Sequence, residues 1–364
     1  MIERLLNRLL KHIDGFLMGT IVMTLLLGLF VLYSASGEST GRMTAQLTNI
    51  SVALVVMWVA ANIPPQHLQR VALPLYLLGL VLLLGVAMFG EITNGARRWL
   101  DLGVARIQPS ELMKIAVPMM LAWYFAKREE SLQLADYAIA AIFLAVPAAF
   151  ILKQPDLGTT LLIVGSGVFV IYLAGFSWKL ILALAATFAA LAPVLWSLLH
   201  DYQRRRIIIL FDPHQDPLGA GYHTIQASIA IGSGGLAGKG WLNGTQSQLD
   251  FIPERTTDFI LAVFGEEFGL LGNLFLLLLF TLIIGRGMFI AAQAQNTFCR
   301  LLAGSITLTF FTYAFVNIGM VSGILPVVGV PLPLISYGGT SLVTLMLGFG
   351  ILMSIQTHKK LVAT

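Results

Sequence analysis

Charged side chains cluster at one boundary of a largely apolar sequence, in "FIPERTTDFILAVFGEE" at residues 251–267. Asp258 stands immediately before the apolar run, close to Glu254 and Arg255. Carboxylates can exchange protons with a reacting group, and guanidinium groups bind phosphate oxygens. An acidic residue at this place can also simply stabilise the first turn of a helix. The charged neighbours make Asp258 the leading candidate for chemistry, and both interpretations stay open.

Two further boundaries carry charge in the same way. In "QPSELMKIAVP", Glu111 and Lys114 lie three residues apart and therefore on one face of a helix. In "KQPDLGTT", Asp156 directly precedes an apolar run. Because burying charges is costly even when they are paired, we favour a functional role for Glu111 and Lys114 over a structural ion pair. For Asp156, helix capping and a functional role have equal weight.

The segment at residues 200–257 contains further cations that could bind an anion. Arg204, Arg205 and Arg206 form an uninterrupted run. Such a run is usually a solvated surface, but it also suits the phosphates of lipid headgroups or of a lipid pyrophosphate. Lys239 lies in the glycine cluster "GSGGLAGKG", where Gly240 follows it. This cluster lacks the spacing, and the following Ser or Thr, of a nucleotide-binding P-loop, so we expect no nucleotide site there.

Two acidic residues, Glu266 and Glu267, lie within the apolar run that follows Asp258. A charged side chain inside a membrane is costly, so at least one of them must face the bundle interior or a wet cavity. Hydrogen bonding within the protein is the interpretation that we favour for both.

The elements that position these side chains are predicted to be membrane-spanning helices. The chain of 364 residues is 57% hydrophobic and 11% charged, whereas soluble domains contain about 25% charged residues. It contains ten apolar runs of about the length that spans a bilayer, at residues 16–34, 44–63, 71–89, 110–126, 135–152, 159–174, 178–199, 258–285, 301–321 and 339–356. We therefore predict an all-α polytopic membrane protein in which residues 1–364 form a single domain.

The distribution of basic residues predicts the topology. More lysines and arginines lie in the short segments on the side of the N-terminus than in those on the other side, which places both termini in the cytoplasm. Residues 1–13 have one basic and one apolar face, as an interfacial amphipathic helix has. The net charge of +4 follows from this topology and does not indicate nucleic-acid binding. The single cysteine, Cys299, excludes an internal disulfide, and the histidines lack metal-ligand spacing.

Two irregular segments interrupt the helices. Residues 200–257 form a long loop between the seventh and eighth helices, on the outer side; its apolar stretches favour a functional loop over a disordered one. Residues 322–339, "SGILPVVGVPLPLISYGG", are apolar but broken by prolines. Such a backbone is tolerated at membrane depth where it is buried in protein or lines a wet cavity, which predicts a re-entrant loop before the tenth helix. The alternative is an apolar outer loop among the lipid headgroups.

Several longer motifs resemble a known family. "ARRWLDLG", "QPSELMK", "QPDLGTT", "GTQSQLDFIPERTTDF", "GEEFGLLG" and "VGVPLPLISYGG" occur in this order along nearly the whole chain. Together they resemble the SEDS family (shape, elongation, division and sporulation), and the residues after "PE" resemble its cell-elongation branch more than its division branch. The resemblance implies a ten-span peptidoglycan glycosyltransferase that polymerises lipid II at the outer face of the bacterial cytoplasmic membrane. It also implies a class B penicillin-binding protein as the partner that crosslinks the strands.

The resemblance further implies roles for single residues. Asp258 matches the catalytic aspartate of the family, and Glu111, Lys114 and Asp156 match other functionally important positions. The aspartate would be the general base that deprotonates the attacking sugar 4-hydroxyl. Direct attack on the lipid-linked donor implies inversion at the anomeric carbon, and an activated donor requires no ATP site.

The leaving lipid pyrophosphate requires cations at the depth of the headgroups. The substrate-binding candidates are Lys114 first and, after it, Lys239, Arg255 and the run Arg204, Arg205 and Arg206. A divalent cation such as Mg²⁺ or Mn²⁺ is an additional option, for which Glu111 and Asp156 could provide ligands.

Two other functions stay open beside polymerisation. A lipid II flippase would also use many helices, intramembrane acids and a re-entrant loop. A noncatalytic scaffold for the crosslinking transpeptidase would use the outer residues as contacts. For the glycosyltransferase, the expected partners are lipid II, the nascent glycan strand, membrane lipids and the transpeptidase, and we expect no nucleic acid.

Overall fold

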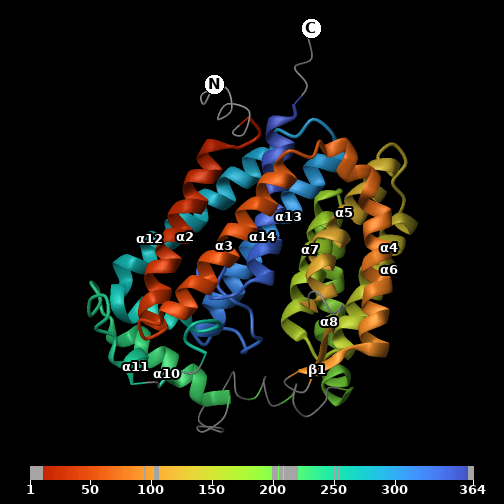
Figure 1. Cartoon of the computed structure of the whole chain (residues 1–364). Helices are drawn as coiled ribbons and strands as arrows, with labels where there is room; N and C mark the ends of the chain where they lie inside the picture. Colours follow the sequence, from red (N-terminus) through yellow and green to blue (C-terminus); the bar gives the residue numbers. More distant parts are fainter. Residues whose placement is uncertain are drawn as a thin grey trace, which may run out of the picture.

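The computed structural model of the chain describes residues 11–93, 96–101, 106–198, 204, 208, 220–249, 251–252 and 254–359. All ten predicted apolar segments form helices (Figure 1). Their bounds are α2 (Gly15–Ala35), α3 (Thr40–Ala61), α4 (Pro65–Phe89), α5 (Pro109–Arg128), α6 (Leu134–Lys153), α7 (Leu157–Leu173), α8 (Trp178–Leu198), α12 (Ile260–Ala292), α13 (Thr297–Val321) and α14 (Thr340–Thr357). The short helices α10 (Ala220–Ser233) and α11 (Thr245–Gln248) lie between α8 and α12. The interfacial helix predicted at residues 1–13 falls largely outside the described residues.

Length and composition identify the membrane-spanning helices. Seven helices of the described chain are long and apolar enough to cross a bilayer, namely α2, α3, α4, α6, α12, α13 and α14. Helix α7 is apolar but shorter. A chain with this many apolar helices is a multi-pass membrane protein.

Local capping explains where several helices begin. The carboxylate of Asp14 accepts the backbone N–H of Leu17 at 2.9 Å at the start of α2. The side chain of Asn296 does the same for the N–H of Cys299, at 2.8 Å, at the start of α13. Such side chains satisfy N–H groups that have no partner within the helix.

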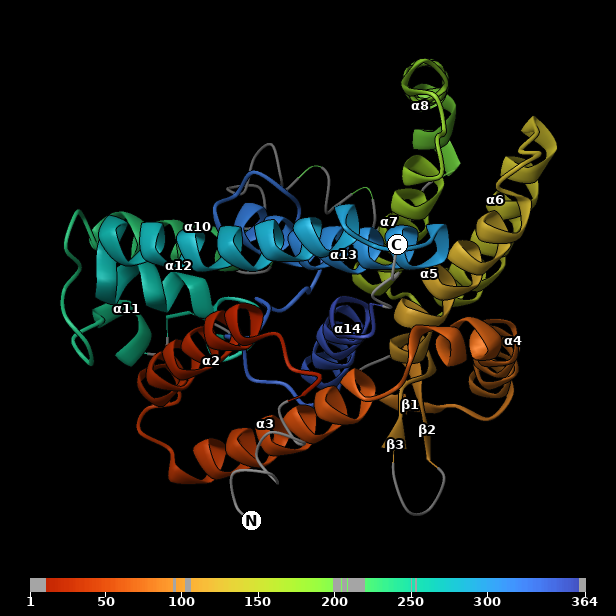
Figure 2. The same cartoon turned by 90° about the horizontal axis from the view of Figure 1, so that it is seen from above.

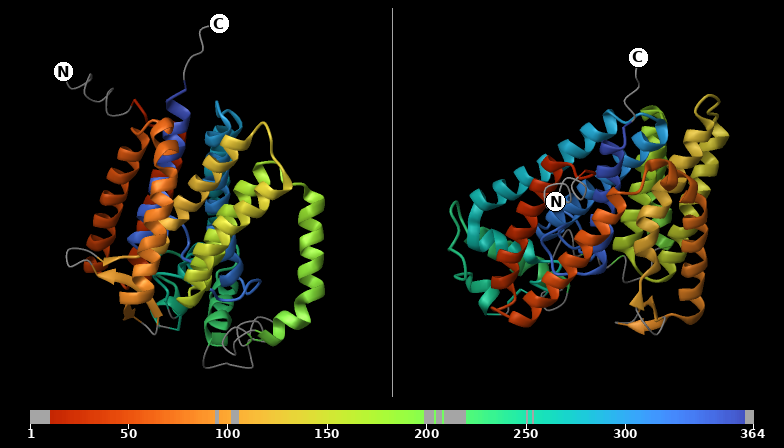
Figure 3. Two further views of the ribbon diagram at one scale, coloured as in Figure 1. Left: turned by 90° about the vertical axis from the view of Figure 1, so that its right-hand side faces the viewer. Right: turned by 45° about the horizontal axis from the view of Figure 1, so that its top comes forward.

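The core of the bundle is built around α13. This helix packs against α5, α7 and α12, while α14 packs against α3. More of α13 is buried than of any other candidate span in the described chain. The view from above shows α8 standing apart from the other helices, and the left-hand view of Figure 3 agrees (Figures 2 and 3).

The two ends of the bundle differ in what they carry. Helix α2 begins and α14 ends at the top of Figure 1. The short helices α10 and α11 and the strand β1 lie at the opposite end (Figure 1). The described chain therefore enters and leaves the bundle at one end, and its extra-helical segments gather at the other.

A small sheet precedes α5, which corrects the all-α prediction in this detail. Strands β1 (Glu91–Thr93), β2 (Ala96–Asp101) and β3 (Arg106–Ile107) are antiparallel in the order β1-β2-β3. Trp99 pairs with Glu91, and Leu100 pairs with Ile107. The strands are too short to show a clear alternation of apolar residues, but the Asn-Gly pair at residues 94–95 is a hairpin signal that the sequence analysis missed.

Residues 322–339 form the irregular segment between α13 and α14. Its apolar side chains Val330, Leu332, Leu334 and Ile335 are buried in the protein. The second half of the segment is therefore packed against the helices, whereas Ile324 in its first half is exposed.

Candidate functional site

A polar cavity of about 190 Å³ lies where α5 and α7 begin. Strand β2, helix α13, the segment 322–339 and the start of α14 complete its wall. Its lining residues are Arg98, Gln108, Glu111, Lys114, Asp156, Gly158, Thr159, Leu162, Tyr313, Gly329, Val330, Pro331 and Ser341. Three of the predicted site residues, Glu111, Lys114 and Asp156, therefore share one cavity.

The first turns of α5 position Glu111 and Lys114. Because three residues separate them on one helix, their side chains meet, and the Nζ of Lys114 donates to the Oε1 of Glu111 at 2.7 Å. The same Nζ donates to the hydroxyl of Tyr313 on α13 at 2.6 Å. Lys114 is buried, and the second carboxylate oxygen of Glu111 has no hydrogen-bond partner among the described residues.

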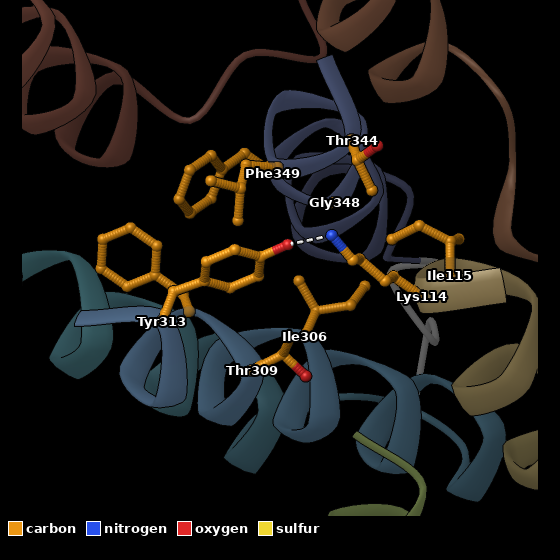
Figure 4. Close-up of a pocket in the computed structure, with 10 residues that line it drawn as sticks. Lys114, Ile115, Ile306, Thr309, Tyr313, Thr344, Gly348 and Phe349 are labelled. Atoms are coloured by element: carbon orange, nitrogen blue, oxygen red, sulfur yellow. Dashed lines mark hydrogen bonds between the residues drawn. The ribbon is translucent and has the colours of Figure 1, made fainter. Parts of the chain in front are cut away.

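Figure 4 shows this contact from inside the bundle, with Tyr313 reaching from α13 toward the ammonium group of Lys114. A second, smaller cavity of about 20 Å³ lies beside the pair and is lined mainly by apolar side chains such as Ile306 and Phe349. The sequence analysis missed Tyr313, since a tyrosine in the middle of an apolar helix carries no spacing signal.

The N-terminus of α7 positions Asp156. Its carboxylate caps the helix by accepting the N–H of Thr159 at 3.1 Å. It also faces the guanidinium group of Arg98 on strand β2, with 3.7 Å between the Nε and Oδ2. Arg98 donates in addition to the carbonyl of Pro155 at 2.9 Å. Asp156 therefore caps α7 and also lines the cavity. Arg98 is a further cavity residue, which the sequence analysis did not select.

The charges of the cavity balance one another. Arg98 and Lys114 contribute two cations, and Glu111 and Asp156 contribute two carboxylates. Each carboxylate already has a cation beside it. Among the described residues, no group of three or more His, Cys, Asp or Glu side chains could hold a metal ion. This donor set does not fit a resident divalent cation, although an ion that arrives with a pyrophosphate would belong to the substrate.

Asp258 lies in the turn that leads into α12, next to the wall of the polar cavity. A Cβ placed on the cavity residue Gly329 would lie 3.4 Å from the Oδ2 of Asp258. Burial, and after it the charge of Glu254, raises the pKa of Asp258 to about 6. A half-buried carboxylate with a pKa near neutrality suits a group that takes up a proton.

Gly329 should be sensitive to substitution, because its φ of +72° belongs to the left-handed region. Gly329→Ala is expected to destabilise the protein by about 1–2 kcal/mol and to lower activity, since the strained segment carries the wall beside Asp258. Gly41→Ala is the control, because a Cβ there meets open space. Thermal unfolding and turnover measure both effects, and equal behaviour of the two variants would contradict the prediction.

The other predicted cations lie elsewhere. Lys239 donates to Glu266 at 2.7 Å, Arg255 donates to the carbonyl of Ser247, and Arg204 donates to the carbonyl of Trp196 at 3.0 Å. Within the described residues, the lining of the polar cavity does not include these three cations. Arg205 and Arg206 lie outside the described residues.

The glycine cluster and the two acids of α12 form a structural unit. Helix α12 is broken at Gly269, whose φ is +63°. The backbone N–H groups of Lys239 and Gly240 donate to the carbonyls of Glu266 and Glu267, both at 3.0 Å. A Cβ on Gly238 would overlap the carbonyl of Glu267, so glycine permits this close approach.

The side chains of the two acids are bound within the protein as well. The Glu266 carboxylate accepts the backbone N–H groups of Gln246 and Ser247 at the start of α11. Glu267 accepts the hydroxyl of Ser34 on α2. These contacts agree with the expected structural role of both side chains.

Comparison with known proteins places the chain beside membrane proteins of cell-wall synthesis. The model of a family described as cell cycle proteins, FtsW/RodA/SpoVE, matches residues 16–361. The peptidoglycan glycosyltransferase MrdB of Escherichia coli K12 is 53% identical over 353 residues, which covers 97% of this chain and 95% of that protein.

Two solved structures have the same fold. One is described as showing the structural coordination of polymerization and crosslinking by a peptidoglycan synthase complex; it matches with a TM-score of 0.85 and 29% identity over 95% of this chain and 99% of that one. The other is the rod shape determining protein RodA of Thermus thermophilus, with a TM-score of 0.71 and 27% identity over 95% of this chain and 98% of that one.

Proposed function

This chain belongs to the FtsW/RodA/SpoVE family of cell cycle proteins, and from that membership we propose that it is a peptidoglycan glycosyltransferase. It polymerises lipid II into glycan strands at the outer face of the cytoplasmic membrane during cell elongation. The observation that carries this proposal is the 53% identity to the glycosyltransferase MrdB over nearly the whole chain. The geometry supports it, because a carboxylate with a raised pKa lies beside a cavity lined by charged groups.

In the proposed reaction Asp258 is the general base. Its carboxylate takes the proton of the acceptor 4-hydroxyl while the oxygen forms a bond to the anomeric carbon of the donor. The bond from that carbon to the pyrophosphate oxygen breaks on the opposite face, and the lipid pyrophosphate leaves with the electron pair. The anomeric carbon is therefore inverted, and the proton remains on Asp258 until solvent removes it.

The cations of the polar cavity stabilise the departing pyrophosphate. Lys114 is buried and held in place by Glu111 and Tyr313, so it presents a preorganised positive charge. Arg98 is 37% exposed, and its guanidinium group is held at the cavity by the Pro155 carbonyl at 2.9 Å and by Asp156 at 3.7 Å, so it is a second cation that can contact a phosphate there. Lys239, Arg255 and the Arg204–Arg206 run are secondary candidates, and Mg²⁺ or Mn²⁺ would enter with the pyrophosphate.

The proposed topology places this site on the outer side. Ten crossings put both termini in the cytoplasm, residues 200–257 outside and residues 322–339 as a re-entrant loop before the tenth helix. The support is that the described chain enters and leaves the bundle at one end. A class B penicillin-binding protein is the proposed partner, since one structural relative is described as a complex for polymerization and crosslinking.

Lipid II supplied to sealed vesicles tests the function against its alternatives. The protein and its transpeptidase partner are reconstituted, and lipid II is added at the face that carries the outer loops. A glycosyltransferase makes glycan polymer without any transfer across the bilayer. A flippase moves lipid II and makes no polymer, whereas a scaffold does neither; both results would overturn the proposal.

The rate of polymerisation should fall as the pH decreases through about 6, because only the ionised carboxylate of Asp258 accepts a proton. An ordinary aspartate would keep the rate constant down to about pH 4. The ratio kcat/KM is measured between about pH 5 and pH 8 at constant ionic strength. A rate that is the same at both ends of this range would contradict the assignment.

A further inference from the structure

The irregular segment at residues 322–339 raises a question about its backbone. Residues 330–336 of this segment are largely buried, yet they form no regular hydrogen-bonded structure, and Leu334 has a φ of +66° that is strained for a residue with a side chain. Buried backbone N–H and C=O groups must find partners. The partners that they find show what this segment holds in place.

Several hydrogen bonds join the segment to the turn that contains Asp258. The N–H of Tyr337 donates to the carbonyl of Thr256 at 2.8 Å. The hydroxyl of Ser336 donates to the carbonyl of Thr257 at 2.6 Å and accepts the N–H of Leu332 at 2.8 Å. The turn before α12 and the segment before α14 are thus tied together through consecutive carbonyls.

Asn317 on α13 provides the next link. Its Nδ2 donates to the main-chain carbonyl of Asp258 at 2.8 Å and to that of Val330 at 2.7 Å. The two hydrogens of one amide nitrogen therefore bridge the turn and the segment. The opposite orientation of the amide would place its oxygen against both carbonyls, so the contacts themselves determine the orientation.

This bridge has a cost that a purely apolar contact would avoid. Asn317 is fully buried, and its Oδ1 has no hydrogen-bond partner among the described residues. A buried polar atom without a partner costs about 1–3 kcal/mol. An apolar side chain at residue 317 would avoid this cost. It could not donate hydrogen bonds to the two carbonyls, as the amide does.

We propose that Asn317 is a positioning residue that fixes the main chain of Asp258 against the wall formed by Gly329 and Val330. This inference rests on the proposed function, because it assumes that Asp258 does the chemistry. Asn317 binds the main-chain carbonyl of Asp258 itself. On the other side it binds the carbonyl of Val330, which directly follows Gly329. Without the bridge the turn and the wall can separate, and the carboxylate leaves its reactive place.

Asn317→Leu removes both donors and keeps a side chain of similar volume. We expect kcat for lipid II polymerisation to fall by about 10- to 100-fold, because displacements of about 1 Å cost this much in catalysis. The KM should change by less than about threefold, since Asn317 does not line the polar cavity in the described structure. The acidic limb of the pH profile should move to lower pH, because a turn that is no longer held lets water reach Asp258.

Two other titratable groups lie near the turn that contains Asp258. Glu254 lies on the same turn and is exposed. His223 on α10 faces the turn, with its ring 5.6 Å from that of Phe259. Burial lowers the pKa of His223, although the charge of Glu254 opposes this.

Thr307→Val is the matched control, because Thr307 is a buried residue of the same helix whose hydroxyl donates to the carbonyl of Ala303 at 2.8 Å. Its kcat should stay within about twofold of the wild-type value, and its pH limb should not move. If it loses as much kcat as Asn317→Leu, or if Asn317→Leu keeps the wild-type kcat and limb, the inference is wrong.

Thermal unfolding shows whether Asn317→Leu is folded. Where it is not, Ser336→Ala decides in its place: it removes the hydrogen bond to the Thr257 carbonyl and should lower kcat and shift the limb in the same direction. A wild-type profile of that variant would overturn the inference. Two further measurements separate the failures. If the wild-type protein makes no glycan polymer in the vesicle assay, the proposed function is wrong. Full activity of Asp258→Asn would remove Asp258 as the base and the positioning role with it, whereas an inactive Asp258→Asn with an unaffected Asn317→Leu would overturn the positioning role alone.

Discussion

Replacing Asp258 with asparagine is expected to slow lipid II polymerisation by about 10²- to 10⁴-fold, the factor that a general base typically contributes. Asparagine has the same shape but cannot accept a proton. The fold should persist, because the hydrogen bond from Asn317 goes to the main-chain carbonyl of residue 258. The neutral amide also avoids the burial of a charge, which is what raises the pKa of Asp258.

The measurement combines turnover with thermal unfolding of the purified complex. The variant should unfold at the same temperature as the wild-type protein or at a higher one, so that a loss of rate reports on chemistry. Glu254→Gln is the matched control: it removes a carboxylate from the same turn, should keep the rate within about threefold, and should move the acidic limb to lower pH. Substantial turnover by a folded Asp258→Asn protein would remove Asp258 as the base.

Replacing Lys114 with methionine is expected to cause the second large effect. It leaves the half-buried carboxylate of Glu111 without its cation; breaking a fully buried pair in this way destabilises a protein by about 3–5 kcal/mol, which is the upper limit here. It also removes the cation that we assign to the pyrophosphate, so polymerisation should fall below detection. Thermal unfolding and polymerisation assays measure the two losses separately.

The double variant Glu111→Gln/Lys114→Met separates stability from catalysis. Neither side chain then carries an unpaired charge, so most of the lost stability should return. Polymerisation should stay lost, because the positive charge at residue 114 is still missing. If the double variant regains activity together with stability, the pair is structural and the pyrophosphate is bound elsewhere.

Local patterns in the sequence predicted most of the fold. Each of the ten apolar runs is a helix, because a bilayer requires long apolar segments whose backbone groups bond internally. The pairing of Glu111 with Lys114 was predictable for the same reason, since a spacing of three residues on a helix brings side chains together. The cap formed by Asp156 was also visible as an acidic residue before an apolar run.

Sequence patterns did not predict the short strands or the contacts of the glycine cluster. The sheet of β1, β2 and β3 was missed because its strands are too short for an alternating pattern to stand out. The role of the glycine cluster was also hidden: it fits against the break of α12 at Gly269, and two segments more than 25 residues apart in sequence must meet before that fit exists.

The sequence by itself determined which segments are helices and which boundaries carry charge, because both depend on residues that are neighbours along the chain. The tertiary structure alone decided which of these charges meet. The hydroxyl of Tyr313 reaches Lys114 across 199 positions of sequence, and Asn317 reaches Asp258 across 59. Such contacts depend on how α13 packs against α5 and on how residues 322–339 fold back, and neither follows from the period of a single helix.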